Sequence, residues 1–177
     1  LLTGNGRMSD ETSYQLGEYL RAGGKADDFK GTLPDCSLII DAIFGTGLKR
    51  PAEGIHADSI RAINQSAAKK LSIDLPSGIF CDGETLAEPA VRADRTITFT
   101  LPRPAHFLSP FYSYCGTVTV ADIGIPPEHI AAERIRTEIF DAALAARLLP
   151  KRPFESNKSD YGRLLLLCGA QGYTGAP

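Results

Sequence analysis

Apolar and polar positions along the chain alternate between helical and strand-like patterns. Residues 9–20 repeat apolar side chains at helical spacing, and Ser9 is a candidate N-cap, so this segment predicts a helix. The apolar run at residues 37–44 is broken only by one aspartate and ends at glycines, which is typical of a buried parallel strand. Residues 58–69 again show helical spacing. Helix and strand therefore alternate, which favours the α/β class.

Three further segments predict strands of the same sheet. They are short, apolar or β-branched runs bounded by turn residues, and they lie at residues 71–74, 95–99 and 116–120. Helices that alternate with parallel strands pack on the faces of the sheet. We therefore expect an α/β fold in which a three-layer, Rossmann-like sheet carries helices on both faces.

The same pattern begins again towards the end of the chain. Asp141 is a candidate N-cap for an Ala- and Leu-rich helix that Pro150 ends. A polar segment at residues 151–160 is followed by an apolar run at 163–168, which predicts a new buried strand, and then by a glycine-rich turn. We therefore expect a second α/β domain to start here.

Composition and charge exclude several classes of protein. Of the 177 residues, 43% are hydrophobic and 23% are charged, as in ordinary globular proteins and unlike collagen-like or disordered chains. The 19 basic and 21 acidic side chains give a net charge of −2, so we expect no nucleic acid as a partner. The longest apolar runs fall far short of the roughly 20 residues that cross a bilayer, so we expect no membrane segment.

The cysteines give no sign of a metal or redox site. They lie far apart, without a C-x-x-C pair, at Cys36, Cys81, Cys115 and Cys168. Zinc sites and dithiol redox motifs need close pairs, so we interpret all four as reduced thiols of a cytoplasmic protein. We expect them to be buried as small hydrophobic side chains.

Two aspartates are the most informative candidates for chemistry. Asp41 and Asp74 each lie at or near the carboxyl end of an apolar strand, where an ionised carboxylate loses hydration and needs a partner or a use. Their spacing fits one strand–helix–strand unit, so we expect both at the same edge of the sheet, where ligands of open α/β sheets bind. The alternative is that each carboxylate caps a turn by accepting backbone N–H bonds.

A glycine-containing loop at residues 45–51 directly follows the first predicted strand. Its paired glycines can turn backbone N–H groups towards an anion, and Lys49 and Arg50 can add charge for a phosphate or pyrophosphate. The loop departs from a dinucleotide fingerprint, because Arg50 stands where the third glycine belongs and no helix is predicted to start at once. A plain strand-ending turn is the alternative.

The segment DLPSG at residues 74–78 places the Ser77 hydroxyl close to the Asp74 carboxylate. A nucleophilic serine is disfavoured, because the G-x-S-x-G elbow is absent and none of the three histidines lies in a matching strand-end motif. A better use of these oxygens is a hard, weakly charged cation bound by Asp41, the Ser77 hydroxyl and backbone carbonyls. Asp74 is then free for proton transfer.

A series of short motifs carries a family resemblance. IDAIFGTGL at residues 40–48, IDLPSG at 73–78 and ADRTITF at 93–99, continued by GTVTV and DIGIP, together resemble the YjeF N-terminal domain, the NAD(P)H-hydrate epimerase. KSDYGR at 158–163 and GYTGA at 172–176 resemble the opening of the ADP/ATP-dependent NAD(P)H-hydrate dehydratase, a ribokinase-like domain.

The resemblance implies a domain organisation and a function. Residues 1–126 would form the epimerase domain, residues 127–157 a linker and the first helix of the next domain, and residues 158–177 the start of the dehydratase domain. The implied function is repair of damaged NADH and NADPH. The epimerase would interconvert the R and S hydrates, NADHX and NADPHX, and the dehydratase would consume the S form with ADP or ATP.

The resemblance also implies roles for individual residues. Asp41 and Ser77 match the family's potassium ligands, and Asp74 matches the carboxylate that contacts the substrate, our candidate for the general acid/base. Ala176 falls where the dehydratase domain begins to line its own substrate site. The residues that match the loop holding the hydrated nucleotide are Gly45, Thr46, Gly47, Leu48, Lys49, Arg50 and Pro51.

The chain departs from the family pattern in four places. It starts at Leu1 rather than Met, and the family's glycine- and asparagine-rich motif is expected before that residue. The later dehydratase motifs are expected after Pro177, so we expect both ends to be cut and the chain as given to be inactive or impaired. Within the chain, Arg103-Pro-Ala stands where the family often has Lys-Pro-Gly, and NKS at 157–159 replaces His-Lys-Gly.

Two other functions compete with the epimerase. A non-catalytic module could hold a nucleotide with the same loop and cation site, although the presence of both Asp41 and Asp74 favours an enzyme. A simple NAD-dependent dehydrogenase is disfavoured by the broken G-x-G-x-x-G pattern and by the lack of an acidic residue about 20 positions after it at a strand end. The sequence does not define the oligomeric state, and a homo-oligomer stays open.

Overall fold

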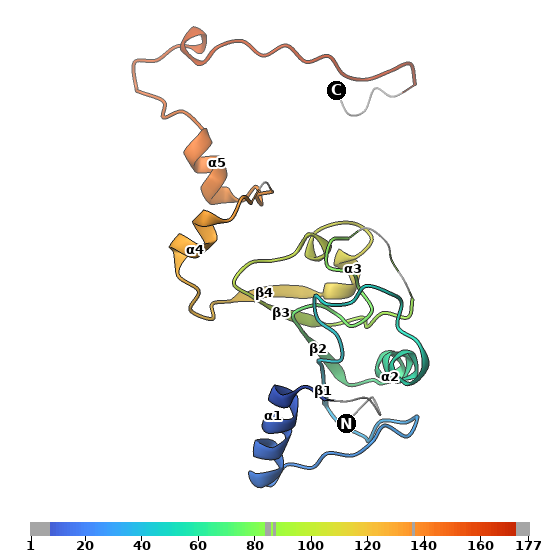
Figure 1. Cartoon of the computed structure of the whole chain (residues 1–177). Helices are drawn as coiled ribbons and strands as arrows, with labels where there is room; N and C mark the ends of the chain where they lie inside the picture. The colour runs from blue at the N-terminus through green and yellow to red at the C-terminus, as the bar shows by residue number, and fades with distance from the viewer. Residues whose placement is uncertain (1–7, 84–85, 87, 136, 173–177) are drawn as a thin grey trace. The chain divides into compact units, whose positions relative to one another are not determined.

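A computed structural model shows the chain as two compact units, Leu1–Pro127 and Glu128–Pro177 (Figure 1). The first unit contains a parallel sheet, and the second contains short helical segments. The residues that the structure describes are 8–83, 86, 88–135 and 137–172.

The first unit is built from four strands and their connecting helices. The strands are β1 (Leu38–Asp41), β2 (Lys69–Ile73), β3 (Arg95–Phe99) and β4 (Thr117–Ala121). The helical elements are α1 (Asp10–Arg21), α2 (Gly54–Gln65), the 3₁₀ turn η1 (Pro104–His106) and α3 (Tyr112–Cys115). The Ser9 hydroxyl accepts the N–H of Thr12, which confirms Ser9 as the N-cap of α1.

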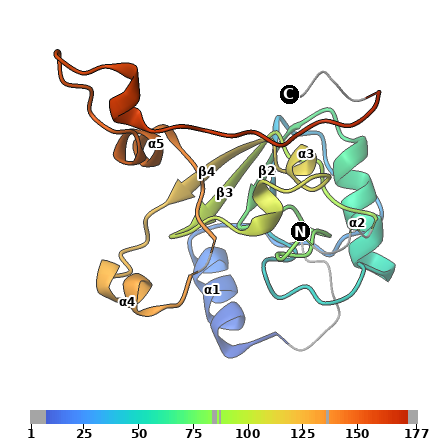
Figure 2. The same ribbon diagram turned by 90° about the horizontal axis from the view of Figure 1, so that it is seen from above.

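All four strands are parallel and lie side by side in chain order, β1–β2–β3–β4 (Figure 1). Figure 2 shows β2, β3 and β4 from above. The register places Asp41 beside Ser72, Ser72 beside Thr96, and Thr96 beside Val118. Register partners in parallel strands point to the same side of a sheet, so these four residues share one face. The parallel α/β arrangement predicted from the sequence is confirmed.

The core of the first unit lies on that shared face. Each connection moves one strand further in the same direction, and crossovers between parallel strands are right-handed, so the connecting segments lie over the same face. Ile39 of β1 packs with Ile60 and Ile63 of α2 in one apolar cluster. Val118 of β4 packs against a second cluster that includes Cys115 of α3. Both apolar clusters therefore lie on the same face of the sheet.

The opposite face of the sheet is only partly covered. In β3, Thr96 and Thr98 on the core face are fully buried, whereas Ile97 between them is half-buried. In β1, Leu38 and Ile40 on this opposite face are 49% and 60% exposed, and α1 buries none of its side chains. The Rossmann-like α/β class is confirmed, and the helices connecting the described strands cover one face because their crossovers share one direction.

Two predicted elements differ from the observed ones by three residues or more at one or both ends. The strand predicted over residues 37–44 already ends at Asp41, because that carboxylate accepts the N–H of Ile43 and turns the chain out of the sheet. The helix predicted over residues 58–69 begins and ends four residues earlier, as α2. Ser66 has extended backbone and leads directly into β2, so the lysines that follow belong to the strand.

The second unit contains only short elements. These are α4, which begins at the boundary (Pro127–Ala132), α5 (Ala142–Leu148) and the 3₁₀ turn η2 (Lys158–Tyr161). The Asp141 carboxylate accepts the N–H of Leu144, which confirms it as the N-cap of α5. Across the described residues of both units, each helix is too short or too polar to cross a membrane.

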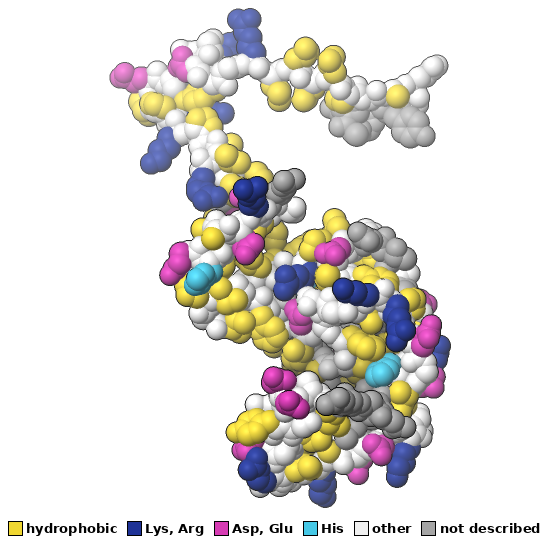
Figure 3. Space-filling model, viewed as in Figure 1, with side chains coloured by type: hydrophobic (Ala, Val, Ile, Leu, Met, Phe, Trp, Pro, Cys, Tyr) yellow, Lys and Arg dark blue, Asp and Glu magenta, His cyan; other side chains and the backbone are white. Residues whose placement is uncertain are grey.

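The strand predicted over residues 163–168 is not formed, so this prediction is wrong. The four leucines of the segment, residues 164–167, are between 65% and 90% exposed, and they form a visible apolar run in Figure 3. A strand needs a neighbour to bond its N–H and C=O groups, and the described residues offer this segment none. The start of a second domain here stays a prediction.

The four cysteines have free thiols, as expected, but they differ in burial. Cys115 is buried in the sheet core, and burial raises the pKa of its thiol to about 11. Cys81 is half-buried. Cys36 and Cys168 are exposed because they lie in irregular segments outside the core, so the prediction of burial is wrong for these two.

Candidate active site

The carboxyl edge of the sheet brings the predicted site residues together. Asp41 is the last residue of β1, and Asp74 directly follows β2. The loop at residues 45–51 leaves the same edge, and the N–H of Thr46 within it lies 3.3 Å from the Asp74 carboxylate. Ser77 approaches from the turn after β2 and bonds Asp41. The two aspartates therefore meet at one edge, as their spacing predicted.

Asp41 is buried, and its carboxylate accepts hydrogen bonds from other groups of the protein. Its Oδ2 atom accepts the Ser72 hydroxyl and the Ser77 N–H, each at 2.8 Å. Its Oδ1 atom accepts the Ser77 hydroxyl at 2.5 Å and the Ile43 N–H at 3.4 Å. These donors compensate the loss of hydration of a side chain that is only 1% exposed. For Asp41, the turn-capping alternative raised from the sequence is therefore realised.

Three oxygen atoms also converge beside Asp41. Ser77 Oγ lies 2.5 Å from Asp41 Oδ1 and 3.4 Å from the carbonyl oxygen of Phe44. A carboxylate, a hydroxyl and a carbonyl make an all-oxygen set, which suits a hard cation. No group of three or more His, Cys, Asp or Glu side chains gathers anywhere in the described residues. The low negative charge of the set fits a monovalent cation better than a divalent one.

Asp74 has an unusual backbone conformation for a residue other than glycine. Its φ angle is 69°, in the left-handed region. The C=O of Ile73 accepts the N–H of Leu75 at 2.9 Å, so Asp74 is the centre of a tight γ-turn. Its own N–H donates to Ile97 at 2.7 Å, and its Oδ1 accepts the Thr98 hydroxyl at 3.1 Å. Such locally strained conformations cluster at functional sites.

Gly45 lets the loop approach the Asp74 carboxylate closely. A Cβ atom at Gly45 would lie 3.1 Å from Asp74 Oδ2, tighter than nine in ten real Cβ contacts. At Gly47, the position of a Cβ atom is open space. The first of the paired glycines is therefore the one that the site geometry requires. Asp74 itself is half-buried, so its carboxylate stays within reach of a ligand.

The rest of the loop lies on the surface. Thr46, Lys49 and Arg50 are exposed, and in the part of the chain that the structure describes neither basic side chain has an ion-pair partner. Both are therefore available to an anionic ligand. Ala176, the residue predicted to line the dehydratase site, lies outside the described residues.

Three residues of the site were not predicted as site residues from the sequence. Ser72 and Thr98 bond the two aspartates, and His106 Nε2 lies 2.9 Å from the carbonyl oxygen of Asp74. Ser72 and Thr98 are polar residues at core-facing strand positions, and that pattern could have identified them. His106 gives no such signal, because it comes from a proline-rich segment 32 residues further along the chain.

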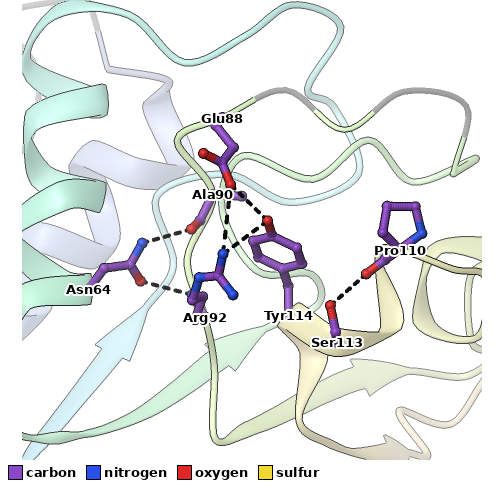
Figure 4. A network of polar contacts seen from close by, with 7 residues as sticks. All are labelled: Asn64, Glu88, Ala90, Arg92, Pro110, Ser113 and Tyr114. Atoms are coloured by element: carbon purple, nitrogen blue, oxygen red, sulfur yellow. Dashed lines mark hydrogen bonds and ion pairs between the residues drawn. The ribbon is translucent and has the colours of Figure 1, made fainter.

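A polar network fixes the loop between β2 and β3 (Figure 4). The Asn64 side chain donates to the carbonyl oxygen of Ala90 at 2.8 Å and accepts the N–H of Arg92 at 2.9 Å. The Arg92 guanidinium lies over the Tyr114 ring, 4.6 Å from its centroid, and the Tyr114 hydroxyl donates to Glu88 at 2.9 Å. The network therefore holds the segment that packs on the turn after β2.

Comparison with known proteins identifies the family. The family described as YjeF-related protein N-terminus matches residues 1–105, more than half of the chain. The chain belongs to this family. The resemblance of the motifs at residues 40–48, 73–78 and 93–99 to the YjeF N-terminal domain is thereby confirmed, and the matched residues include Asp41, Asp74 and Ser77.

The YjeF-related chain is also similar to curated proteins named bifunctional NAD(P)H-hydrate repair enzyme Nnr. It is 39% identical over 139 residues to the protein from Moorella thermoacetica, covering 78% of this chain and 26% of the relative. It is 40% identical over 147 residues to the protein from Synechocystis, covering 81% of this chain and 28% of the relative. For Thermofilum pendens the identity is 36% over 153 residues, covering 86% and 28%. The chain spans about a quarter of the length of these relatives.

Proposed function

We propose that the protein containing this domain interconverts the R and S hydrates of NADH and NADPH. The observation that carries the proposal is the half-buried Asp74 carboxylate beside the exposed, basic loop at residues 45–51. The site stands at the carboxyl edge of a parallel sheet, where such folds bind nucleotides. The names of the relatives, which refer to NAD(P)H-hydrate repair, supply the substrate class.

The reaction needs a group that donates and accepts a proton, next to a site that binds the dinucleotide. Hydration places a hydroxyl on C6 of the nicotinamide ring and creates the R and S centres. Inversion at C6 proceeds by loss and return of the hydroxyl or by opening and closing of the C6–N1 bond. Either route needs a proton to be given and taken back, with no net change in atoms or charge. Asp74 performs that exchange as general acid/base in this proposal.

In this proposal the loop at residues 45–51 binds the substrate. Its backbone N–H groups and the side chains of Lys49 and Arg50 would bind the pyrophosphate, which carries negative charge in the hydrates of both NADH and NADPH. The N–H of Thr46 already points at the Asp74 carboxylate, at 3.3 Å. In this proposal the loop binds the substrate and Asp74 transfers the proton, and the two lie next to each other at the carboxyl edge of the sheet.

The complete gene product should accelerate the exchange between the two hydrates. A chromatographically resolved single epimer of NADPH hydrate is incubated with the protein, and the return to the R/S equilibrium is followed by the same chromatography. Heat-denatured protein gives the spontaneous rate. A protein that binds the hydrate but leaves exchange at that spontaneous rate is a nucleotide-binding module, and the epimerase proposal is then wrong.

We further propose that the same gene product dehydrates the S hydrate with ADP or ATP. The support is the resemblance of the segments at residues 158–163 and 172–176 to the opening of that dehydratase, and the word "bifunctional" in the names of the relatives. The two activities would act in sequence, because epimerisation converts the R hydrate into the form that the dehydratase consumes.

We also propose that a potassium ion binds beside Asp41. The Asp41 carboxylate, the Ser77 hydroxyl and the Phe44 carbonyl would hold it, since their oxygens converge there. When bound, the ion would supply positive charge at the carboxyl edge of the sheet. Ser77 and Asp41 join β1 to the turn after β2, so they also keep the two halves of the site in register.

Potassium chloride should raise the melting temperature of the complete gene product relative to choline chloride at equal ionic strength. Binding to the folded state alone stabilises by about 2.7 kcal/mol when the ligand is at about 100 times its Kd. Asp41→Asn should abolish this rise because it removes the charge of the site, whereas Asp74→Asn should keep it. Equal melting temperatures of the wild-type protein in the two salts would rule out the site.

A further inference from the structure

His106 is a buried histidine that lies directly behind the candidate catalytic carboxylate. It is the last residue of η1, and its side chain is only 3% exposed. The neighbouring Ala105 is fully buried and its N–H donates to the Cys81 carbonyl, so the backbone at this point is anchored in the core. The imidazole therefore occupies a defined position rather than a mobile surface one.

Hydrogen bonds at both ring nitrogens define the tautomer of His106. The N–H of Arg103 donates to Nδ1 at 2.9 Å, so Nδ1 is an acceptor and carries no proton. Nε2 lies 2.9 Å from the carbonyl oxygen of Asp74, which can only accept, so Nε2 carries the proton and donates it. Burial lowers the pKa of His106 below its ordinary value of 6.5, and Arg103 acts in the same direction, whereas Asp74 opposes it. The ring is therefore neutral at pH 7 with its proton on Nε2.

The backbone of Asp74 is the part of the site that needs such support. Its left-handed conformation at φ 69° is disfavoured for residues other than glycine by about 1 kcal/mol or more. The N–H of Asp74 is bonded within the sheet, whereas its carbonyl oxygen is bonded from outside the sheet, by His106. That bond fixes the peptide plane that follows Asp74 and with it the direction of the side chain.

We propose that His106 is a positioning residue for the Asp74 carboxylate. Its Nε2–H group holds the carbonyl oxygen of Asp74 and so keeps the γ-turn that places the carboxylate between Thr98 and the loop. The inference rests on the proposed function, because its catalytic consequence requires Asp74 to transfer the proton. It assigns to His106 no contact with the substrate.

Two substitutions in the complete gene product test the role of this donor. His106→Gln keeps an N–H donor at a similar reach, whereas His106→Leu has a similar volume and no donor. We expect His106→Leu to lower kcat for R/S exchange by about 10- to 100-fold, because displacements of about 1 Å have effects of that order, and to leave KM within about twofold. We expect His106→Gln to restore kcat to within about threefold of wild type, since it supplies the missing hydrogen bond.

A purely structural role would give a different result. Loss of folding would lower the amount of active protein and the melting temperature in both variants, without a selective fall in kcat for the leucine variant. Equal kcat values for wild type and His106→Leu, or equal losses in the leucine and glutamine variants, overturn the proposal.

Crystal structures of the two variants separate this inference from the proposed function. We expect the Asp74 carbonyl and carboxylate to move in His106→Leu and to stay in place in His106→Gln. If the wild-type protein shows no exchange activity, the proposed function fails, and these structures still decide whether His106 positions Asp74. An unmoved Asp74 in the leucine variant contradicts the positioning role.

Discussion

Replacing Asp74 with asparagine should lower the rate constant for R/S exchange by about 10²- to 10⁴-fold, the usual contribution of a general acid/base. Asparagine has nearly the same shape, and its one carbonyl oxygen can still accept either the Thr98 hydroxyl or the Thr46 N–H, but it cannot give and take back a proton. Affinity for the hydrate should change little, because the loop at residues 45–51 holds the pyrophosphate in the proposed site. The measurement compares exchange rates at saturating hydrate, with the dissociation constant determined separately.

Asp58→Asn is the matched control for this substitution. It makes the same chemical change on the exposed surface of α2, where Asp58 pairs with Arg61 at 2.7 Å. Exposed ion pairs contribute little, so this variant should exchange the hydrates at the wild-type rate. Wild-type turnover by Asp74→Asn, or an equal loss in the two variants, would show that the Asp74 carboxylate is not the proton-transferring group.

Gly78→Ala should destabilise the first unit by about 3 to 5 kcal/mol, an effect at the upper end for a single substitution. Gly78 has a φ angle of 103°, which disfavours any residue with a Cβ atom. That Cβ would also collide with the carbonyl oxygen of Pro89 and lie 2.7 Å from Ala90 Cα. These atoms are backbone held by the Asn64 network, so they cannot move aside cheaply. The expected result is a loss of amide hydrogen-exchange protection in β2 and β3.

Gly31→Ala separates the two causes of this effect. Gly31 has a similar φ angle of 91°, but the space where its Cβ would lie is open. This variant should therefore show only the conformational cost, about 1 to 2 kcal/mol. If both alanine variants lose protection to the same extent, the close packing of the turn against residues 89–90 contributes nothing.

Much of the site's location could be predicted from the sequence. Parallel strands joined by one crossover end at the same edge, so the spacing of Asp41 and Asp74 was enough to place both aspartates at that edge. The loop at residues 45–51 comes a few residues after the end of β1, and its place at that edge follows for the same reason. These predictions depend only on strand direction and chain order, both of which apolar patterns specify well.

The separate uses of the two aspartates could not be predicted. The patterns around them are alike, yet Asp41 is enclosed by donors from Ser72 and Ser77, whereas Asp74 stays half-buried beside the loop. This difference depends on side-chain contacts between segments more than 30 residues apart. Hydropathy patterns carry no information about such contacts. The hydrogen bond from His106 to Asp74 could not be predicted for the same reason.

The wrong predictions also have a physical cause. The segment at residues 163–168 has the composition of a buried strand, but composition expresses only a preference for a pleated, covered environment. Without a neighbouring strand among the described residues, the segment is irregular and its leucines are exposed. The early end of β1 at Asp41 has a local cause. The Asp41 carboxylate accepts the N–H of Ile43, and this bond takes the place of a further hydrogen bond between strands.

The hydrogen bonds of Asp41 couple assembly of the site to folding. They connect residues 31 and 36 positions apart, so they require β1 and β2 to be paired. A chain in which the strands are still separate has the loop sequence and both aspartates but no arranged carboxylate pair. Binding competence should therefore arise in one cooperative step with the sheet, and a partly folded chain should not retain the hydrated nucleotide.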